Sequence, residues 1–451
     1  MEKQNQTNNP LTSLSSIQNQ KLRVLWWSNA VHTQTGYGVQ TNNCVYRLAK
    51  QGYDIRVAAN YGLEGAALGF NNVIQYPHLF SEFGEDTLKL AVDFWHPHVL
   101  VTLYDIWVGK YSRFFNEENW ISKLHPRWIA WLPVDSEPVA DGVAEQAGKA
   151  YRAVAMSQFG QRELKKAGVS ASYIPHGVEA QVFKPSPDKK TSKQWLEKHS
   201  APINLKVPCH INNEDYVVGV NKANKDPARA DYDRMLLAYK IFLENNPDAR
   251  VDSKMFLHTW CGFPGGTPIR ELCHKYGLEG NVKSTFEYDL MCGLTPQAMA
   301  MQYGAFDVLL NLARGEGFGV PILEAASCGV PSVATDFSSM TELVSGHGWL
   351  IPPYASEYHG GVKLRNGLSS LWALPDEYKA ADALEDAYNH PEKVKRFGED
   401  SRRFALGYDF DTTVIPLWRD LLGEVESELG MFGNAKNKDD AYEALYRAAA
   451  K

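Results

Sequence analysis

Two glutamates, Glu316 and Glu324, stand eight positions apart around a glycine-rich stretch. The residues before them, 306–312, form a nearly unbroken apolar run, which is typical of a parallel strand buried on both faces. Pro321 follows the glycines, and proline favours the first position of a helix. Such a helix start offers N–H groups to a diphosphate, while carboxylates accept hydrogen bonds from vicinal sugar hydroxyls. The pattern therefore predicts a nucleotide-sugar site, and a purely structural glycine turn is the alternative interpretation.

The surrounding string, Asn311 to Glu342, makes this pattern more specific. It contains E-G-F-G-V-P-I-L-E-A-x-x-C-G-V-P, which closely resembles the Glu-x7-Glu signature of glycosyltransferase family 4, the retaining enzymes of GT-B fold. The resemblance implies that Glu324 binds the ribose hydroxyls of the donor and that Glu316 binds the transferred sugar near its anomeric region. It also implies donor contacts from three backbone amides, those of Phe318, Gly319 and Val320.

A second glycine turn, with Gly36 and Gly38, follows the first predicted strand at 22–27. A dinucleotide fingerprint needs a third glycine where Thr41 stands and an acid where Asn60 ends the next strand. Those departures argue against an NAD site. The turn resembles instead the loop that faces the donor phosphates in family 4, although a plain tight turn stays an alternative.

Two cations, Lys225 and Arg229, follow the strand predicted at 216–220. Family 4 enzymes present an arginine and a lysine to the donor diphosphate here, where cations stabilise a leaving group. The spacing differs in this chain, so these residues could also be exposed loop charges. His258 ends the strand predicted at 255–259 and could line the nucleotide pocket.

Asp135 is the main departure from the family pattern. Many family members carry a histidine at the end of the strand that corresponds to 128–133, and Asp135 takes that place here. Its carboxylate could orient the acceptor hydroxyl, bind a donor hydroxyl, or be a buried and satisfied structural group. Asp409-Phe410-Asp411 has the D-x-D form that binds metals in a different transferase fold, and we interpret it as an N-cap region. The resemblance implies no metal and no cofactor.

The length of 451 residues exceeds what one hydrophobic core usually supports, so two domains are expected. The expected fold class is α/β, a GT-B arrangement of two Rossmann-like domains facing across a cleft, with a C-terminal helix crossing back to the N-terminal domain. The expected parts are a flexible arm (1–20), an acceptor domain (21–205), a nucleotide-sugar domain (206–404), and the crossover helix with its tail (405–451).

The composition is that of a soluble protein, with 44% hydrophobic and 22% charged residues. No apolar run approaches the roughly 18 residues that a membrane span needs, and the polar N-terminus lacks a signal core. Six cysteines show no CxxC or metal-like spacing. These features predict a cytoplasmic protein with reduced thiols and no stable membrane association, located in the host cytoplasm if the gene belongs to a phage.

The resemblance implies transfer of a hexose such as glucose from a nucleotide-diphosphate donor, a UDP-sugar above all, to an acceptor hydroxyl with retention. We expect Glu316 and Asp135 to be the catalytic residues, although Asp135 departs from the family pattern. The stretches 35–38 and 131–138 resemble a bacteriophage and bacterial subgroup, whose acceptors could be modified DNA, protein or glycan. A phage enzyme acting on hydroxymethylated bases is one alternative, which the net charge of −7 disfavours modestly. A non-catalytic nucleotide- or polymer-binding protein on a transferase fold is the other.

Overall fold

The computed structural model describes residues 21–81, 83–106, 126–354, 363–365 and 370–429. These residues form two compact units. Unit 1 takes its described residues from 1–130, 150–152 and 415–451, and unit 2 takes them from 131–149 and 153–414. The predicted arm and the tail after Leu429 lie outside the described residues, and the domain boundary near residue 205 stays a prediction.

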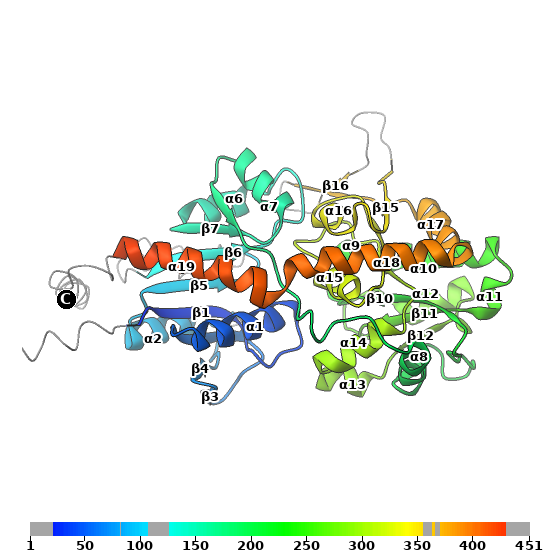
Figure 1. Cartoon of the computed structure of the whole chain (residues 1–451), viewed down its shortest axis with the longest axis horizontal. Coiled ribbons are helices and arrows are strands. Elements are labelled where there is room, and N and C mark those ends of the chain that lie inside the picture. Colours follow the sequence, from blue (N-terminus) through cyan, green and yellow to red (C-terminus); the bar gives the residue numbers. More distant parts are fainter. Residues whose placement is uncertain (1–20, 82, 107–125, 355–362, 366–369, 430–451) are drawn as a thin grey trace, which may run out of the picture. The chain divides into compact units, whose positions relative to one another are not determined.

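Unit 1 is built on a mostly parallel sheet in which β1 pairs with both β2 and β5. Its strands are β1 (Arg23–Asn29), β2 (Asp54–Tyr61), β3 (Leu68–Phe70), β4 (Val73–Tyr76) and β5 (Val99–Leu103), in the order β3-β4-β2-β1-β5. Its helices are α1 (Gly36–Lys50), α2 (Glu85–Trp95) and α19 (Ile415–Leu429) (Figure 1). β1 and β5 are buried along almost their whole length, as parallel strands packed between helices are.

Helix α1 begins at Gly36, so both glycines of the predicted turn lie in its first turn. The hydroxyl oxygen of Thr35 caps it by accepting a hydrogen bond from the Gly38 N–H at 3.0 Å. A side chain at position 38 would place its Cβ 2.1 Å from Thr33 Oγ1, so only glycine fits there.

The C-terminal helix α19 belongs to unit 1, although the chain reaches it from unit 2. It lies against α1 and β1 (Figure 1), and its fully buried Trp418 approaches Trp26 with ring centroids 5.0 Å apart. This confirms the predicted helix that crosses back to the N-terminal domain.

Unit 2 contains a seven-stranded sheet in the order β15-β14-β13-β10-β11-β12-β9, parallel except at β9. Strand β6 (Arg127–Leu132) ends inside this unit. The remaining strands are β7 (Arg152–Ala155), β8 (Ala171–Tyr173), β9 (Ser200–Pro202), β10 (Tyr216–Asn221), β11 (Ser253–His258), β12 (Val282–Thr285), β13 (Val308–Asn311), β14 (Ser332–Thr335), β15 (Trp349–Ile351), β16 (Lys363–Arg365) and β17 (Leu371–Ala373).

Helices follow most of these strands, and apolar residues of several of these helices form a buried core with the sheet. They are α6 (Asp141–Lys149), α7 (Gln158–Lys166), α8 (Lys189–Lys198), α9 (Pro227–Ala230), α10 (Tyr232–Asn245), α11 (Ala249–Asp252), α12 (Ile269–Tyr276), α13 (Glu287–Cys292), α14 (Pro296–Gly304), α15 (Val320–Ser327), α16 (Ser339–Val344), α17 (Glu377–Asn389) and α18 (Pro391–Ala405), then the short turns η1 (Leu406–Tyr408) and η2 (Phe410–Val414). Ser157 caps α7, since its Oγ accepts the Gly160 N–H at 3.0 Å.

The strand order of unit 2 indicates which end of the sheet would bind a ligand. From the central β10 the chain proceeds to β11 and β12 on one side, and β13 and β14 then lie on the other. The strand order therefore reverses between β10 and β13. In open α/β sheets, ligands bind outside the carboxyl ends of the strands at such a switch point. Asn221 and Asn311 end those two strands.

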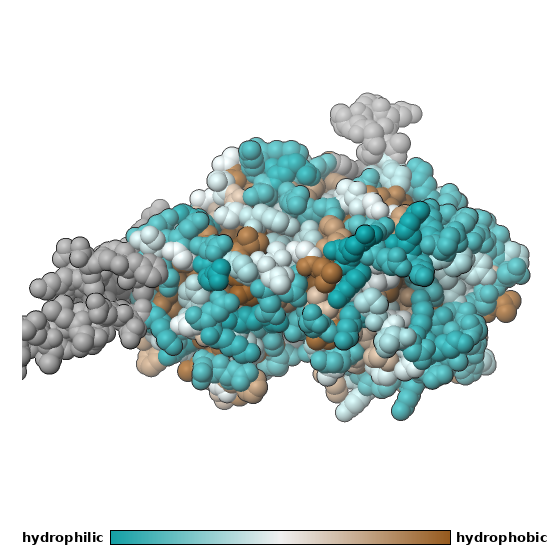
Figure 2. Space-filling view, viewed as in Figure 1, coloured by the Kyte–Doolittle hydropathy of each residue, from teal (hydrophilic) through white to brown (hydrophobic). Residues whose placement is uncertain are grey.

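The surface in Figure 2 is mostly hydrophilic, with apolar side chains scattered among polar ones. Within the described part of the chain, no helix combines the length and apolarity needed to cross a membrane.

Candidate functional site

A charged cluster occupies the switch point between β10 and β13. Lys222 follows β10 directly, and Glu316 lies in the loop that leads from β13 to α15. The Lys222 ammonium forms an ion pair with Oε1 of Glu316, and Arg229 Nη1 lies 3.1 Å from Oε2. Asn311 Nδ2 donates a hydrogen bond to Oε1 at 3.3 Å. Both oxygens of one carboxylate are thus held by cations from the neighbouring strand's loop.

Local structure explains why both cations reach this carboxylate. Tyr232 donates a hydrogen bond to the carbonyl oxygen of Lys222, which fixes the chain just after β10. Pro227 starts α9, and Asp226 caps it by accepting the Arg229 N–H at 3.2 Å. The single turn of α9 therefore places Arg229 over the loop, where its Nη1 also lies 3.5 Å from the carbonyl oxygen of Gly315.

The cluster is buried, so its electrostatics are strong. The side chains of Lys222 and Glu316 are 8% and 14% exposed. Burial alone would raise the pKa of Glu316, but the charges of Lys222 and Arg229 outweigh it and lower that pKa to about 2. Burial lowers the pKa of the Lys222 ammonium, and the Glu316 carboxylate opposes this fall. At neutral pH the site therefore holds an ionised carboxylate beside cations suited to phosphate oxygens.

The second glutamate, Glu324, lies on α15 in a different environment. Tyr303 donates a hydrogen bond to its Oε2 at 2.8 Å, and Asn221 Nδ2 donates to the Tyr303 hydroxyl at 2.6 Å. Burial raises the pKa of Glu324 to about 7, the Tyr303 hydrogen bond lowers it, and the charge of Glu179 raises it further. Half of this carboxyl group is thus held by protein, and its remaining acceptor capacity suits a pair of hydroxyl groups.

Between the two glutamates lies the N-terminus of α15. Gly319 precedes the helix with φ of 97°, a left-handed conformation that favours glycine. Phe318 is buried, with its ring 5.3 Å from that of His176. Among the described residues, none accepts a hydrogen bond from the amides of Phe318, Gly319 or Val320. These N–H groups and the helix dipole offer a place for an anion.

Asp135 lies close to this loop. A Cβ added at Gly315 would lie 2.1 Å from the carbonyl oxygen of Asp135, and one at Gly317 would lie 2.4 Å from Cβ of Pro133. The two glycines therefore allow the loop that carries Glu316 to pack directly on the residues that follow β6. Asp135 is partly buried, and its backbone is a neighbour of the predicted sugar site.

The other predicted residues are placed less centrally. His258 ends β11, where its Nδ1 lies 2.8 Å from Thr285 Oγ1 and burial lowers its pKa to about 4. Lys225 is exposed on the same loop as Lys222. Gly36 and Gly38 belong to unit 1.

The sequence pattern does not single out every residue of the cluster. It leaves out Lys222, Asn311, Tyr303 and Asn221, although three of them stand at the carboxyl end of a strand. That position was the available signal, since such ends line the ligand edge of the sheet.

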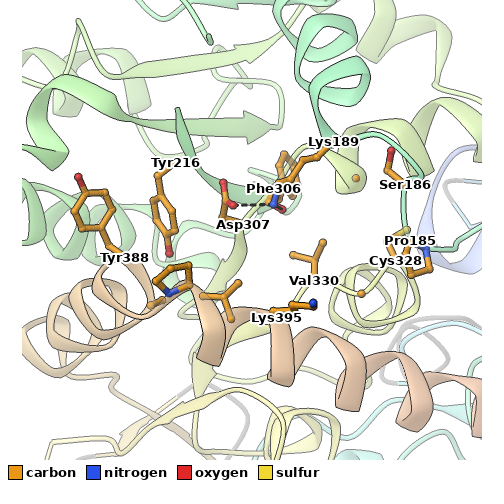
Figure 3. Close-up of a pocket in the computed structure, with 15 residues that line it drawn as sticks. Pro185, Ser186, Lys189, Tyr216, Phe306, Asp307, Cys328, Val330, Tyr388 and Lys395 are labelled. Atoms are coloured by element: carbon orange, nitrogen blue, oxygen red, sulfur yellow. Dashed lines mark hydrogen bonds and ion pairs between the residues drawn. The ribbon is translucent and has the colours of Figure 1, made fainter. Parts of the chain in front are cut away.

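A pocket of about 320 Å³ lies at the opposite edge of this sheet (Figure 3). Tyr216, Asp307 and Val330, among its lining residues, stand at or just before the amino ends of β10, β13 and β14. The Lys189 ammonium approaches Oδ1 of Asp307 at 2.7 Å. No predicted site residue among the described ones lines this pocket, so its chemistry is separate.

In the ranges that the structure describes, no group of three or more His, Cys, Asp or Glu side chains could hold a metal ion. Asp409 instead accepts hydrogen bonds at Oδ1 from the backbone N–H groups of Asp411 and Thr412, at 3.0 and 3.2 Å. This confirms the predicted N-cap role of the D-x-D sequence.

The chain also resembles a known protein family and several solved structures. Residues 262–359 match the family model for Glycosyl transferases group 1. That segment contains β13, α15 and β14, and therefore both glutamates. No curated protein sequence matches the chain.

Three solved structures show the fold over most of the chain. HepE of Anabaena, in complex with UDP and glucose, is 16% identical with a TM-score of 0.61, covering 89% of this chain and 100% of its own. Sucrose-phosphate synthase from Thermosynechococcus elongatus is 13% identical with a TM-score of 0.64, covering 90% and 100%. The UDP-forming α,α-trehalose-phosphate synthase from Burkholderia vietnamiensis is 12% identical with a TM-score of 0.59, covering 90% and 99%. The chain thus has the predicted GT-B fold with two Rossmann-like domains.

Proposed function

We propose that this protein is a retaining glycosyltransferase of family 4 type that moves a hexose from a UDP-sugar to an acceptor hydroxyl. The observation that carries the proposal is the arrangement at the switch point of unit 2. Glu316 and Glu324 flank the start of α15, and Lys222 and Arg229 hold the Glu316 carboxylate between them. Charge, helix dipole and hydroxyl acceptors thus meet at one sheet edge.

Each group of this arrangement has a role in binding the donor or in transferring its sugar. Glu324 accepts hydrogen bonds from the ribose hydroxyls, because Tyr303 occupies only one side of its carboxyl group. The amides at the start of α15 bind the diphosphate, and Lys222 and Arg229 offset the negative charge that grows on it as it leaves. Glu316 faces the transferred sugar, whose oxocarbenium-like charge a carboxylate stabilises. No metal is required, because these cations supply the positive charge.

Asp135 is proposed to act on the acceptor side. Its backbone lies against Gly315, so it neighbours the loop that carries Glu316. The acceptor class stays open among modified DNA, protein and glycan, and the stretches at 35–38 and 131–138 favour a phage or bacterial setting.

Donor binding and turnover test this proposal together. Addition of UDP-glucose should raise the melting temperature of the wild type, since a ligand of the native state stabilises it by mass action. Glu324→Ala should abolish the shift, whereas Glu244→Ala, at an exposed position on α10, should keep it. Slow release of UDP from UDP-glucose without acceptor should accompany binding. A protein that binds the nucleotide sugar and never releases UDP would be a binding protein, and no shift with any nucleotide sugar would refute the donor site.

A further inference from the structure

Ser338, in the loop after β14, has a backbone conformation that glycine normally occupies. Its φ is 56° and its ψ is −144°. The backbone of a residue other than glycine is strained in this region, and such strain persists only where the surrounding structure holds the residue in place. Ser338 is also buried, with 4% of its surface exposed. The protein therefore has a hydroxyl group at a position where a glycine would remove the backbone strain.

The hydroxyl of Ser338 acts on the backbone of Glu316. Its Oγ accepts a hydrogen bond from the Glu316 N–H at 2.9 Å. The next residue, Ser339, donates its hydroxyl to the carbonyl oxygen of Glu316 at 2.8 Å. Two adjacent hydroxyls thus hold the N–H and the C=O of the same residue, across 22 and 23 positions of the chain.

The residues beside Glu316 explain why such a restraint is useful. Gly315 and Gly317 flank it, and glycines leave the backbone free to adopt many conformations. The side chain is held by cations that a donor diphosphate would also attract. If those cations were drawn toward the phosphates, the two backbone hydrogen bonds would still hold the residue that carries the carboxylate.

We infer that Ser338 and Ser339 are positioning residues, which aim the Glu316 carboxylate at the transferred sugar. This inference rests on the proposed function and deepens it. The strain at Ser338 accompanies this role, because the residue that would remove the strain would also remove the hydrogen-bond acceptor.

The decisive variant is Ser338→Gly. If Ser338 positions Glu316, donor binding should weaken while stability is kept. If Ser338 only supports the fold, stability should fall while donor binding is kept. Relief of strain should leave the melting temperature equal to or above that of the wild type. Loss of the acceptor should still raise the Kd for UDP-glucose and lower kcat/KM for UDP release, by about three- to tenfold each. Ser339→Ala should weaken binding similarly. The control is Ser332→Ala, since Ser332 is a buried serine of β14 whose hydroxyl has no partner among the described residues.

Hydrogen exchange supplies a readout that needs no donor. The Glu316 amide should exchange faster in Ser338→Gly than in the wild type, and unchanged exchange would overturn the inference. Wild-type Kd and kcat/KM in Ser338→Gly would overturn it too, even with the proposed function intact. If wild type itself binds no nucleotide sugar, the proposed function fails, and the assignment of these serines to donor positioning falls with it.

Discussion

Replacing Lys222 by methionine should reveal how strongly the buried ion pair supports unit 2. The change removes an ammonium that is 8% exposed and leaves the Glu316 carboxylate with Arg229 and Asn311. The folded protein lowers the pKa of Glu316 to about 2 from the ordinary 4.5. That difference corresponds to about 3 kcal/mol in favour of the ionised carboxylate. Because Arg229 remains, we expect Lys222→Met to cost roughly 2–3 kcal/mol of stability at pH 7.

The pH dependence has a definite sign. A carboxyl group with a lowered pKa contributes stability that is present above pH 4.5 and is lost as the pH falls from 4.5 toward 2. The difference in stability between wild type and Lys222→Met should therefore shrink in acid, where Glu316 becomes protonated in both proteins.

Thermal unfolding of four proteins measures the coupling: the wild type, Lys222→Met, Glu316→Gln and the double variant. The double variant should be more stable than the sum of the single losses predicts, because no charge is left buried without its partner. Lys240→Met is the matched control, since Lys240 pairs with Glu244 near the surface and should cost under about 1 kcal/mol. Additive losses, or a Lys222→Met loss no larger than the control, would refute the buried-pair reasoning.

Three further predictions concern other parts of the chain. Burial raises the pKa of Glu324 to about 7, so the wild type loses stability as the pH rises from 4.5 through 7. The variant Glu324→Gln should therefore be more stable than the wild type by up to about 3 kcal/mol at pH 8.5 and by little at pH 5. Equal differences in stability at both pH values would contradict this prediction. Trp418→Ala should cost about 3–5 kcal/mol and make α19 sensitive to trypsin, whereas unchanged resistance would argue against its packing on unit 1. Gly317→Ala should lower the melting temperature and weaken UDP-glucose binding, because its Cβ would meet Pro133 at 2.4 Å, while Gly280→Ala, with open space around it, should do neither.

The strand, the loop and the helix around the two glutamates could be predicted from the sequence, because the sequence signals for each of them are local. The apolar run at 306–312, the glycines after it and Pro321 predict a strand, a loop and a helix, and β13 and α15 follow that order. The two glutamates could be singled out in the same way, since they stand at fixed positions around that helix start.

The partners of those glutamates could not be found by local reasoning. Lys222 reaches Glu316 across 94 positions because β10 and β13 are neighbours in the sheet, and a strand order of this kind is a property of the whole fold. Tyr303 meets Glu324 only because α14 and α15 pack together. The strained backbone of Ser338 gave no sequence signal, since serine rarely adopts a positive φ.

Titration calorimetry with UDP-glucose at pH 8 tests the donor site most directly, because Glu324 is then ionised and able to accept hydrogen bonds from a ribose. The wild type should bind about one equivalent, and Glu324→Ala should bind at least about tenfold more weakly with its fold intact. Equal affinity in the two proteins, or no binding of any nucleotide sugar by the wild type, would contradict a donor site at the switch point of unit 2.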